Sequence, residues 1–169
     1  MRQDGVTLTE LLVVISIIGI LAVALGFSYR GWMGSYRIET TTKQLYSDLM
    51  EARTRAMTRN TMHFVTLATR SYQIFEDTDG DNEPGAGDTA IQGYANPKAV
   101  QYDLSWTGDI GFDTRGYAWD FTSDPPVAAA ISVPLSFTSS YAAPDYDCVI
   151  VDQVRIRMGK MSGGVCGAK

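Results

Sequence analysis

The first candidate for chemistry is an acidic stretch over residues 77–88, with the sequence DTDGDNEPGAGD. Carboxylates occupy its first, third, fifth and twelfth positions: Asp77, Asp79, Asp81 and Asp88. An EF-hand loop wraps Ca²⁺ with this spacing. Two features disagree, because Asn82 stands where that loop needs glycine and the flanks indicate strands rather than helices. Asp, Asn, Gly and Pro are also typical of any long exposed loop. A structural calcium site and a solvated connection therefore both stay open, and the sequence suggests no other cofactor.

The histidine and the cysteines set a second limit on the chemistry. There is one histidine, His63, and there are two cysteines, Cys148 and Cys166. These are too few for the usual zinc clusters or for a Ser-His-Asp triad, so a membrane-anchored enzyme that uses the acidic loop has little support. His63 alternates with Val65 and Leu67, which is typical of a packed or edge strand residue. Behind an apolar N-terminal segment, the cysteine pair predicts one disulfide in an oxidising compartment, with two separate thiols as the alternative.

A basic group lies near the C-terminus of an acidic chain. The formal net charge of −5 argues against general nucleic-acid binding, because phosphate contacts need clustered Lys and Arg. The local exceptions are Arg155, Arg157, Lys160 and Lys169. Arg155 and Arg157 alternate with Val154 and Ile156, as residues on the solvent face of a strand do. The group is thus either a surface for phosphate or an ordinary solvated strand face.

A single carboxylate, Glu10, stands at the edge of a long apolar run. No charge occurs between residues 11 and 27, which is just long enough for a helix to cross a bilayer core, since that takes about 20 residues. A carboxylate at the edge of such a span costs roughly a few kcal/mol, so we expect a functional reason for it. A secretory signal fits poorly, because its apolar part is shorter and ends at a small-x-small cleavage site. A plain membrane anchor fits the length but leaves Glu10 unexplained.

The elements that position these groups follow from the hydrophobic periodicity. We expect an amphipathic helix over residues 28–60, with Arg53 and Arg59 either pinning its end onto the following domain, which we favour, or acting as functional charges. Its apolar face consists of Ile38, Thr42, Leu45, Leu49, Ala52 and Ala56. Its polar face consists of Lys43, Gln44, Ser47, Asp48, Glu51 and Arg55. Strands are predicted at 62–67, 72–75, 102–106, 109–112, 117–121, 131–138 and 148–158, with the Pro134 strand at an edge. The fold class is therefore α+β: a long N-terminal helix packed on a small antiparallel β-sheet domain.

The N-terminus has the sequence Gly5-Val6-Thr7-Leu8-Thr9-Glu10, followed by the uncharged run. This segment resembles the type IV prepilin signal. The resemblance implies that a membrane prepilin peptidase cuts between Gly5 and Val6 and methylates the new N-terminus on Val6. It also implies that Glu10 pairs with the α-amino group of a neighbouring subunit, which satisfies both charges in a low dielectric and sets the register of assembly. The chain then divides into a leader (1–5), a transmembrane and filament-core helix (6–27), an amphipathic helix (28–60) and a periplasmic β domain (61–169).

Two later segments extend the resemblance: the pattern L-x-x-D-L-x-x-A-R over residues 45–53, and the sequence GDIGFDTRG over residues 108–116. They are similar to the GspH/FimT group of minor pilins and pseudopilins. The resemblance implies a structural, non-enzymatic subunit in the bacterial inner membrane, with one membrane pass and a periplasmic globular domain, that joins other pilins or pseudopilins in a filament. One role is in the pseudopilus of a type II secretion system, supporting protein secretion. The alternative is a minor pilin of a type IV pilus, for priming, adhesion, twitching or DNA uptake, and only there would Arg155, Arg157 and Lys160 contact DNA.

Overall fold

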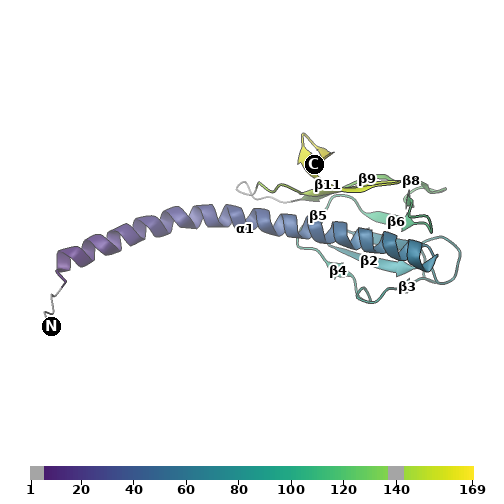
Figure 1. Cartoon of the computed structure of the whole chain (residues 1–169), viewed down its shortest axis with the longest axis horizontal. Helices are drawn as coiled ribbons and strands as arrows, with labels where there is room; N and C mark the ends of the chain where they lie inside the picture. The colour runs from purple at the N-terminus through teal and green to yellow at the C-terminus, as the bar shows by residue number, and fades with distance from the viewer. Residues whose placement is uncertain (1–5, 137–142) are drawn as a thin grey trace.

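One long helix runs into a β-sheet body at the C-terminal end of the helix (Figure 1). The computed structural model describes residues 6–136 and 143–169, and the side chains of residues 24–30 are outside that description. Helix α1 covers Leu8–Arg59, 52 residues, which corresponds to about 78 Å at 1.5 Å per residue. Its N-terminus is capped by Thr7, and its C-terminus ends at Asn60 in the left-handed conformation, with φ of 54°. The predicted continuous helix is confirmed along the backbone.

The first sheet contains seven antiparallel strands in the order β3-β2-β1-β6-β7-β8, with β4 also paired to β2. Its strands are β1 (His63–Ala68), β2 (Ser71–Glu76), β3 (Thr89–Ala90), β4 (Lys98–Ala99), β6 (Gly108–Phe112), β7 (Ala118–Asp120) and β8 (Val127–Ala128). The predicted hairpins β1–β2 and β6–β7 are both present. The acidic stretch connects β2 to β3, so it lies at one end of this sheet.

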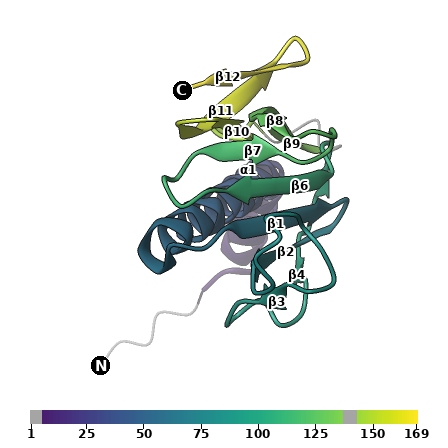
Figure 2. The ribbon, with the colours of Figure 1, turned by 90° about the vertical axis from the view of Figure 1, so that its right-hand side faces the viewer.

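The second sheet contains five antiparallel strands in the order β12-β11-β10-β9-β5. Its strands are β5 (Asp103–Leu104), β9 (Ala130–Ser136), β10 (Cys148–Asp152), β11 (Ile156–Ser162) and β12 (Val165–Ala168). The sequence predicted one small sheet, and the structure has two. The hairpin β11–β12 projects from the body at the C-terminal end of the chain (Figure 2).

Two strand predictions need correction. Residues 148–158 do not form one strand, because the chain reverses after Asp152 and returns as β11, with the Asp152 N–H donating to the Arg155 carbonyl at 2.8 Å. Strand β9 is not a free edge, since β5 pairs with its last residues. The Leu135 N–H donates to the carbonyl of Asp147, the residue before β10. Because successive backbone nitrogens of a strand face opposite sides, the nitrogen of Pro134 faces β5, so its missing N–H costs no hydrogen bond to β10.

The core lies between the C-terminal half of α1 and the two sheets. The helix contributes the predicted apolar face, every member of which is at most 1% exposed: Ile38, Thr42, Leu45, Leu49, Ala52 and Ala56. The sheets contribute alternate residues such as Val65, Ile74, Ile110 and Val149, all nearly inaccessible to solvent. The α+β fold class and the packing of the second half of the helix on the sheets are therefore confirmed.

The N-terminal half of α1 extends away from the sheets (Figure 1). Its large apolar side chains are exposed, from 50% for Val14 to 81% for Leu8. Within the part of the chain that the structure describes, no helix is both long enough and apolar enough to cross a membrane. The last residues of the expected span, 24–27, belong to the stretch whose side chains are not described.

Candidate assembly site and acidic loop

The first turn of α1 holds the residues that the sequence assigned to processing and assembly. Gly5 lies outside the described residues, whereas Val6 is 71% exposed and immediately precedes the cap. The Thr7 hydroxyl oxygen accepts the Glu10 N–H at 3.3 Å, and the Thr7 carbonyl accepts the Leu11 N–H at 3.2 Å. The Glu10 carboxylate is exposed in the first turn, where the positive end of the helix dipole favours an anion.

This cap is a feature that the sequence analysis missed. Thr7-x-x-Glu10 matches the capping-box pattern, in which Ser or Thr at the cap is followed three residues later by Glu or Gln. Glu10 therefore has a local reason to stand where it does, in addition to the intersubunit role that the prepilin resemblance implies. Any test of Glu10 in assembly has to separate these two roles.

The acidic loop brings three of its four predicted carboxylates together. Oxygen atoms of Asp77, Asp79 and Asp81 lie within 4.8 Å of one another. Asp77 is 6% exposed, and its carboxylate accepts the Gly80 N–H at 2.7 Å and the Asn82 N–H at 3.2 Å. Three convergent carboxylates repel one another unless protons, donors or a cation offset their charge.

One objection to the calcium pattern is weaker in the structure. Asn82 has φ of 60°, the left-handed conformation that a glycine would supply at this loop position and that Asn tolerates. The fourth predicted ligand, Asp88, is not in this group; one of its oxygens accepts the Gly85 N–H at 2.8 Å. Partial burial is the main cause that raises the pKa of Asp88, and the neighbouring Asp77, Asp79 and Asp81 raise it further. Calcium at this loop stays a prediction.

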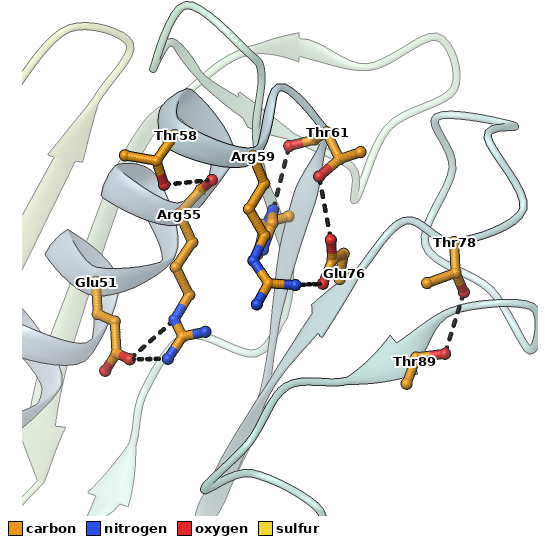
Figure 3. A network of polar contacts seen from close by, with 9 residues as sticks. Glu51, Arg55, Thr58, Arg59, Thr61, Glu76, Thr78 and Thr89 are labelled. Atoms are coloured by element: carbon orange, nitrogen blue, oxygen red, sulfur yellow. Dashed lines mark hydrogen bonds and ion pairs between the residues drawn. The ribbon is translucent and has the colours of Figure 1, made fainter.

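The C-terminal end of α1 is fixed to the first sheet by one ion pair (Figure 3). Arg59 Nη1 lies 2.7 Å from Glu76 Oε2 on β2, and the Thr61 hydroxyl donates to the other oxygen of Glu76 at 3.3 Å. One turn earlier, Arg55 binds Glu51 at 2.7 Å, the predicted i,i+4 pair. The expected role of Arg59 in pinning the helix end is confirmed.

A buried polar group between α1 and the first sheet was not predicted. Asp48 was expected on the solvated face of the helix but is 6% exposed. It accepts hydrogen bonds from the Tyr72 hydroxyl and from Lys98 Nζ, the latter at 2.5 Å, and the Lys98 ammonium lies 5.3 Å from the centre of the Tyr94 ring. Burial, and then the contacts with Asp48, hold the pKa values of Tyr72 and Tyr94 above their usual range. These residues hold the segment around β4 onto the helix.

Comparison with known proteins then decides the family. A family model described as type II transport protein GspH matches residues 41–154, which is more than half of the chain. The chain belongs to the GspH family. A model of the prokaryotic N-terminal methylation motif matches residues 1–26, and no curated protein and no solved structure gives a significant match. The chain is thus a GspH/FimT-like minor pseudopilin of the type II secretion and type IV pilin-like class. Pilin and pseudopilin families are structural, and membership implies processing by prepilin peptidase and assembly with other pilins or pseudopilins.

This GspH-family chain also contains the predicted disulfide. Cys148 on β10 is bonded to Cys166 on β12, with Cα atoms 6.2 Å apart. Strand β11 runs between the two, and Gly159 lies opposite Cys148 in the β10–β11 register. A Cβ atom on Gly159 would come within 2.9 Å of Cys166 Sγ and 2.5 Å of the Gly167 carbonyl oxygen. Glycine is therefore needed where the disulfide passes over the middle strand.

The basic residues near the C-terminus of this GspH-family chain are exposed, and two of them, Arg157 and Lys169, form ion pairs. Arg155 lies in the β10–β11 turn, and Arg157 pairs with Asp152 at 2.6 Å. Lys160 is exposed further along β11. The hydrogen bond and charge of Lys169 are the main cause that lowers the pKa of Asp145, and the charges of Lys160 and Lys43 lower it further. Both arginines are exposed on either side of the buried Ile156, as expected for the solvent face of a strand, although Arg155 immediately precedes the first residue of β11. DNA contact by Arg155, Arg157 and Lys160 stays a prediction tied to the type IV pilus role.

Proposed function

We propose that this chain is a structural, non-enzymatic minor pseudopilin of a type II secretion system. Prepilin peptidase cuts between Gly5 and Val6 and methylates Val6, and the segment from residue 6 to residue 27 holds the subunit in the inner membrane with the body in the periplasm. The subunit then joins other pseudopilins in a filament that supports protein secretion. The observation that carries this proposal is the pairing, on one chain, of the methylation motif at residues 1–26 with the GspH match at residues 41–154.

The exposure of the helix supports the anchoring step. Large apolar side chains surround the N-terminal half of α1 on all sides, and the body offers them no contact surface. A helix that is apolar all round is stable only in a membrane or against other apolar helices. A membrane anchor that later packs into a filament core meets both conditions in turn.

Electrostatics supports a role for Glu10 in assembly. Cleavage before Val6 creates an α-amino cation at nearly the same depth as the Glu10 carboxylate. Either charge alone is unfavourable in an apolar surrounding, whereas a close pair between two subunits satisfies both. The pair would form only when neighbouring helices have the correct axial register, so it selects that register.

The test compares two variants in the first turn of α1. Glu10→Gln removes the charge but keeps the backbone N–H that donates to the Thr7 hydroxyl. Thr7→Ala removes the cap but keeps the carboxylate. We expect Glu10→Gln to abolish incorporation into sheared pseudopili while cleavage at Gly5 continues, and Thr7→Ala to leave most of the incorporation. Normal incorporation of Glu10→Gln would contradict the assembly role, and loss with Thr7→Ala alone would assign the effect to the helix cap.

A deletion strain separates the secretion role from the type IV pilus alternative. We expect the exoproteins in the culture supernatant to be lost in a clean deletion and restored by the gene. Normal secretion, with loss of surface pili or of DNA uptake, would assign the subunit to a type IV pilus. Only in that case would the substitution of Arg155, Arg157 and Lys160 by Gln be expected to reduce DNA uptake.

A further inference from the structure

Two aromatic side chains, Trp32 and Tyr36, lie on the surface of α1 between its exposed half and its packed half. Their rings are stacked, with centroids 6.0 Å apart and planes inclined by 23°. Trp32 is 63% exposed and Tyr36 is 57% exposed. Positions that are four residues apart share one side of a helix, so both rings belong to one surface patch. The two rings lie outside the core of the body.

The position of this pair along the helix axis is informative. The uncharged run ends at residue 27, so Trp32 lies about 7.5 Å and Tyr36 about 13.5 Å further along, at 1.5 Å per residue. The polar layer on each side of a bilayer core is about 5–8 Å thick. Side chains of a helix lean toward its N-terminus, so both rings lie closer to the apolar run than their Cα atoms do. Trp32 thus lies in the polar layer where a helix that spans the bilayer with residues 6–27 would emerge, and the Tyr36 ring stacks on its outer side.

We propose that Trp32 and Tyr36 form an interfacial anchor that docks in the phospholipid headgroup layer before the subunit enters a filament. This inference rests on the proposed function, because it takes residues 6–27 as the membrane span. Indole and phenol rings have an apolar body and a polar edge, and they concentrate at this depth. Arg37 is exposed beside them and supplies a cation for lipid phosphates.

The anchor would also set the distance between the body and the membrane. Among the described residues, the body is hydrogen-bonded to α1 at nearly the same level, where the Ala143 N–H donates to the Ser35 hydroxyl at 2.9 Å. The next contact is the Asp145 N–H to Glu39 Oε1, also at 2.9 Å. Because the body is fixed to the helix from Ser35 onward, rings held in the headgroup layer leave little free helix between the bilayer and the β domain.

The test measures the depth of Trp32 in a bilayer with the full chain. The chain has three tryptophans, so the double variant Trp106→Phe and Trp119→Phe leaves Trp32 as the only indole. This variant is reconstituted into vesicles of phosphatidylethanolamine and phosphatidylglycerol that contain phospholipids brominated either near the headgroup or near the chain end. We expect about twofold stronger quenching by the shallow bromines than by the deep ones. The matched control is Trp32→Phe, which keeps the two tryptophans of the body and should be quenched by neither.

Flotation of the same vesicles distinguishes the outcomes. Protein that fails to float with the lipid would contradict the membrane anchoring of the proposed function, and this inference with it. Protein that floats while Trp32 is unquenched, or is quenched most by the deep bromines, would overturn the anchor alone and leave the proposed function intact. Trp32 emission that is not quenched by the bromines but changes with the protein-to-lipid ratio would show that the rings contact a neighbouring copy of the chain. That result would also overturn the proposal.

Discussion

The two halves of α1 belong to one helix but have opposite surroundings. Between Leu8 and Val23, the large apolar side chains are at least 50% exposed. Between Ile38 and Ala56, the residues of the apolar face are at most 1% exposed. The first half is apolar on all sides and the second has one apolar face, so the width of the apolar surface, more than the hydrophobicity of single residues, distinguishes them.

The difference shows that one helix can be stabilised by two different surroundings. The second half gains its stability from contacts with the sheets, since Leu45, Leu49 and Ala52 lie inside the core of the body. The first half has no such contacts in the isolated chain. Its stability must come from lipid or from other subunits, as the proposed function requires. Substitutions that are chemically identical should therefore have very different effects in the two halves.

The largest difference is expected for one substitution made in both halves. Leu49→Ala removes a side chain that is fully buried and should lower the free energy of unfolding by about 2–5 kcal/mol, because it loses burial and leaves a cavity. Leu12→Ala makes the same change at a side chain that is 55% exposed and should change the stability of the body by less than about 0.5 kcal/mol. Urea unfolding of the full chain in detergent micelles, followed by tryptophan emission, measures both. Equal losses would contradict the division of α1 into two surroundings.

The disulfide should come next in size and should affect the body alone. Replacing both Cys148 and Cys166 by Ser opens a loop between residues that are 18 positions apart, which costs about 3 kcal/mol on the chain-entropy estimate. The helical signal of residues 8–23 in micelles should not change. Gly159→Ala in the same assay should also destabilise the body, since its methyl group would approach the Gly167 carbonyl oxygen. A chain without the disulfide that unfolds at the same urea concentration as the wild type would contradict the first expectation.

These effects also show which parts of the molecule could be predicted from the sequence. The apolar face of α1 and the β1–β2 hairpin were predictable, because the periods of 3.6 and 2 are local patterns and the buried residues follow them. The disulfide was predictable from the number of cysteines and their compartment, and it is present. The α+β class followed from these elements.

The missed features depend on contacts between distant residues or on weak turn signals. Asp48 has a polar side chain on a helix, and its burial depends on Tyr72 and Lys98, which are 24 and 50 positions away. The β10–β11 turn was missed because Gln153-Val154-Arg155 contains neither glycine nor proline. The second sheet was missed for a related reason, since β9 pairs with β10 and with β5 over long separations that single-sequence periodicity does not report.

Calcium, if it binds the acidic loop, should act on the body and leave the N-terminal half of α1 unchanged. Binding at a concentration about 100 times the dissociation constant would stabilise the body by about 2.7 kcal/mol. Thermal unfolding of the full chain in micelles, with calcium or with a chelator, measures this effect. The double variant Asp79→Asn and Asp81→Asn is the control, because it keeps the loop length and removes two of the three convergent charges. A melting temperature that calcium leaves unmoved would identify the loop as a solvated connection.

The smallest of these effects is the pH dependence of the stability of the body, which arises from the titration of His63, the one histidine of the chain. His63 is fully buried, and since its Nδ1 lies 3.1 Å from the Thr61 carbonyl oxygen, which only accepts, Nδ1 carries the proton. Its Nε2 is buried and has no hydrogen-bond partner among the described residues. Burial is the main cause that lowers the pKa of His63 below its usual value; Arg59 and Arg55 act in the same direction, while the Thr61 carbonyl and Glu76 oppose it.

The sign of the His63 effect follows from proton binding. The unfolded chain takes up a proton near pH 6.5, whereas the folded chain resists it until a lower pH, so the stability of the body is complete above about pH 6.5 and falls as the pH drops toward the folded pKa. His63→Gln removes this titration and should flatten the dependence of the urea midpoint on pH in that window.

Asp88→Asn is the matched control, since the raised pKa of Asp88 changes the stability in the opposite direction and at lower pH. Residues 8–23 contain one ionisable side chain, Glu10, so their helical signal should not follow the His63 titration. A wild-type midpoint that stays constant from pH 7.5 to 5.5 would show that a proton reaches His63 in the folded body at little cost, against its burial in this structure.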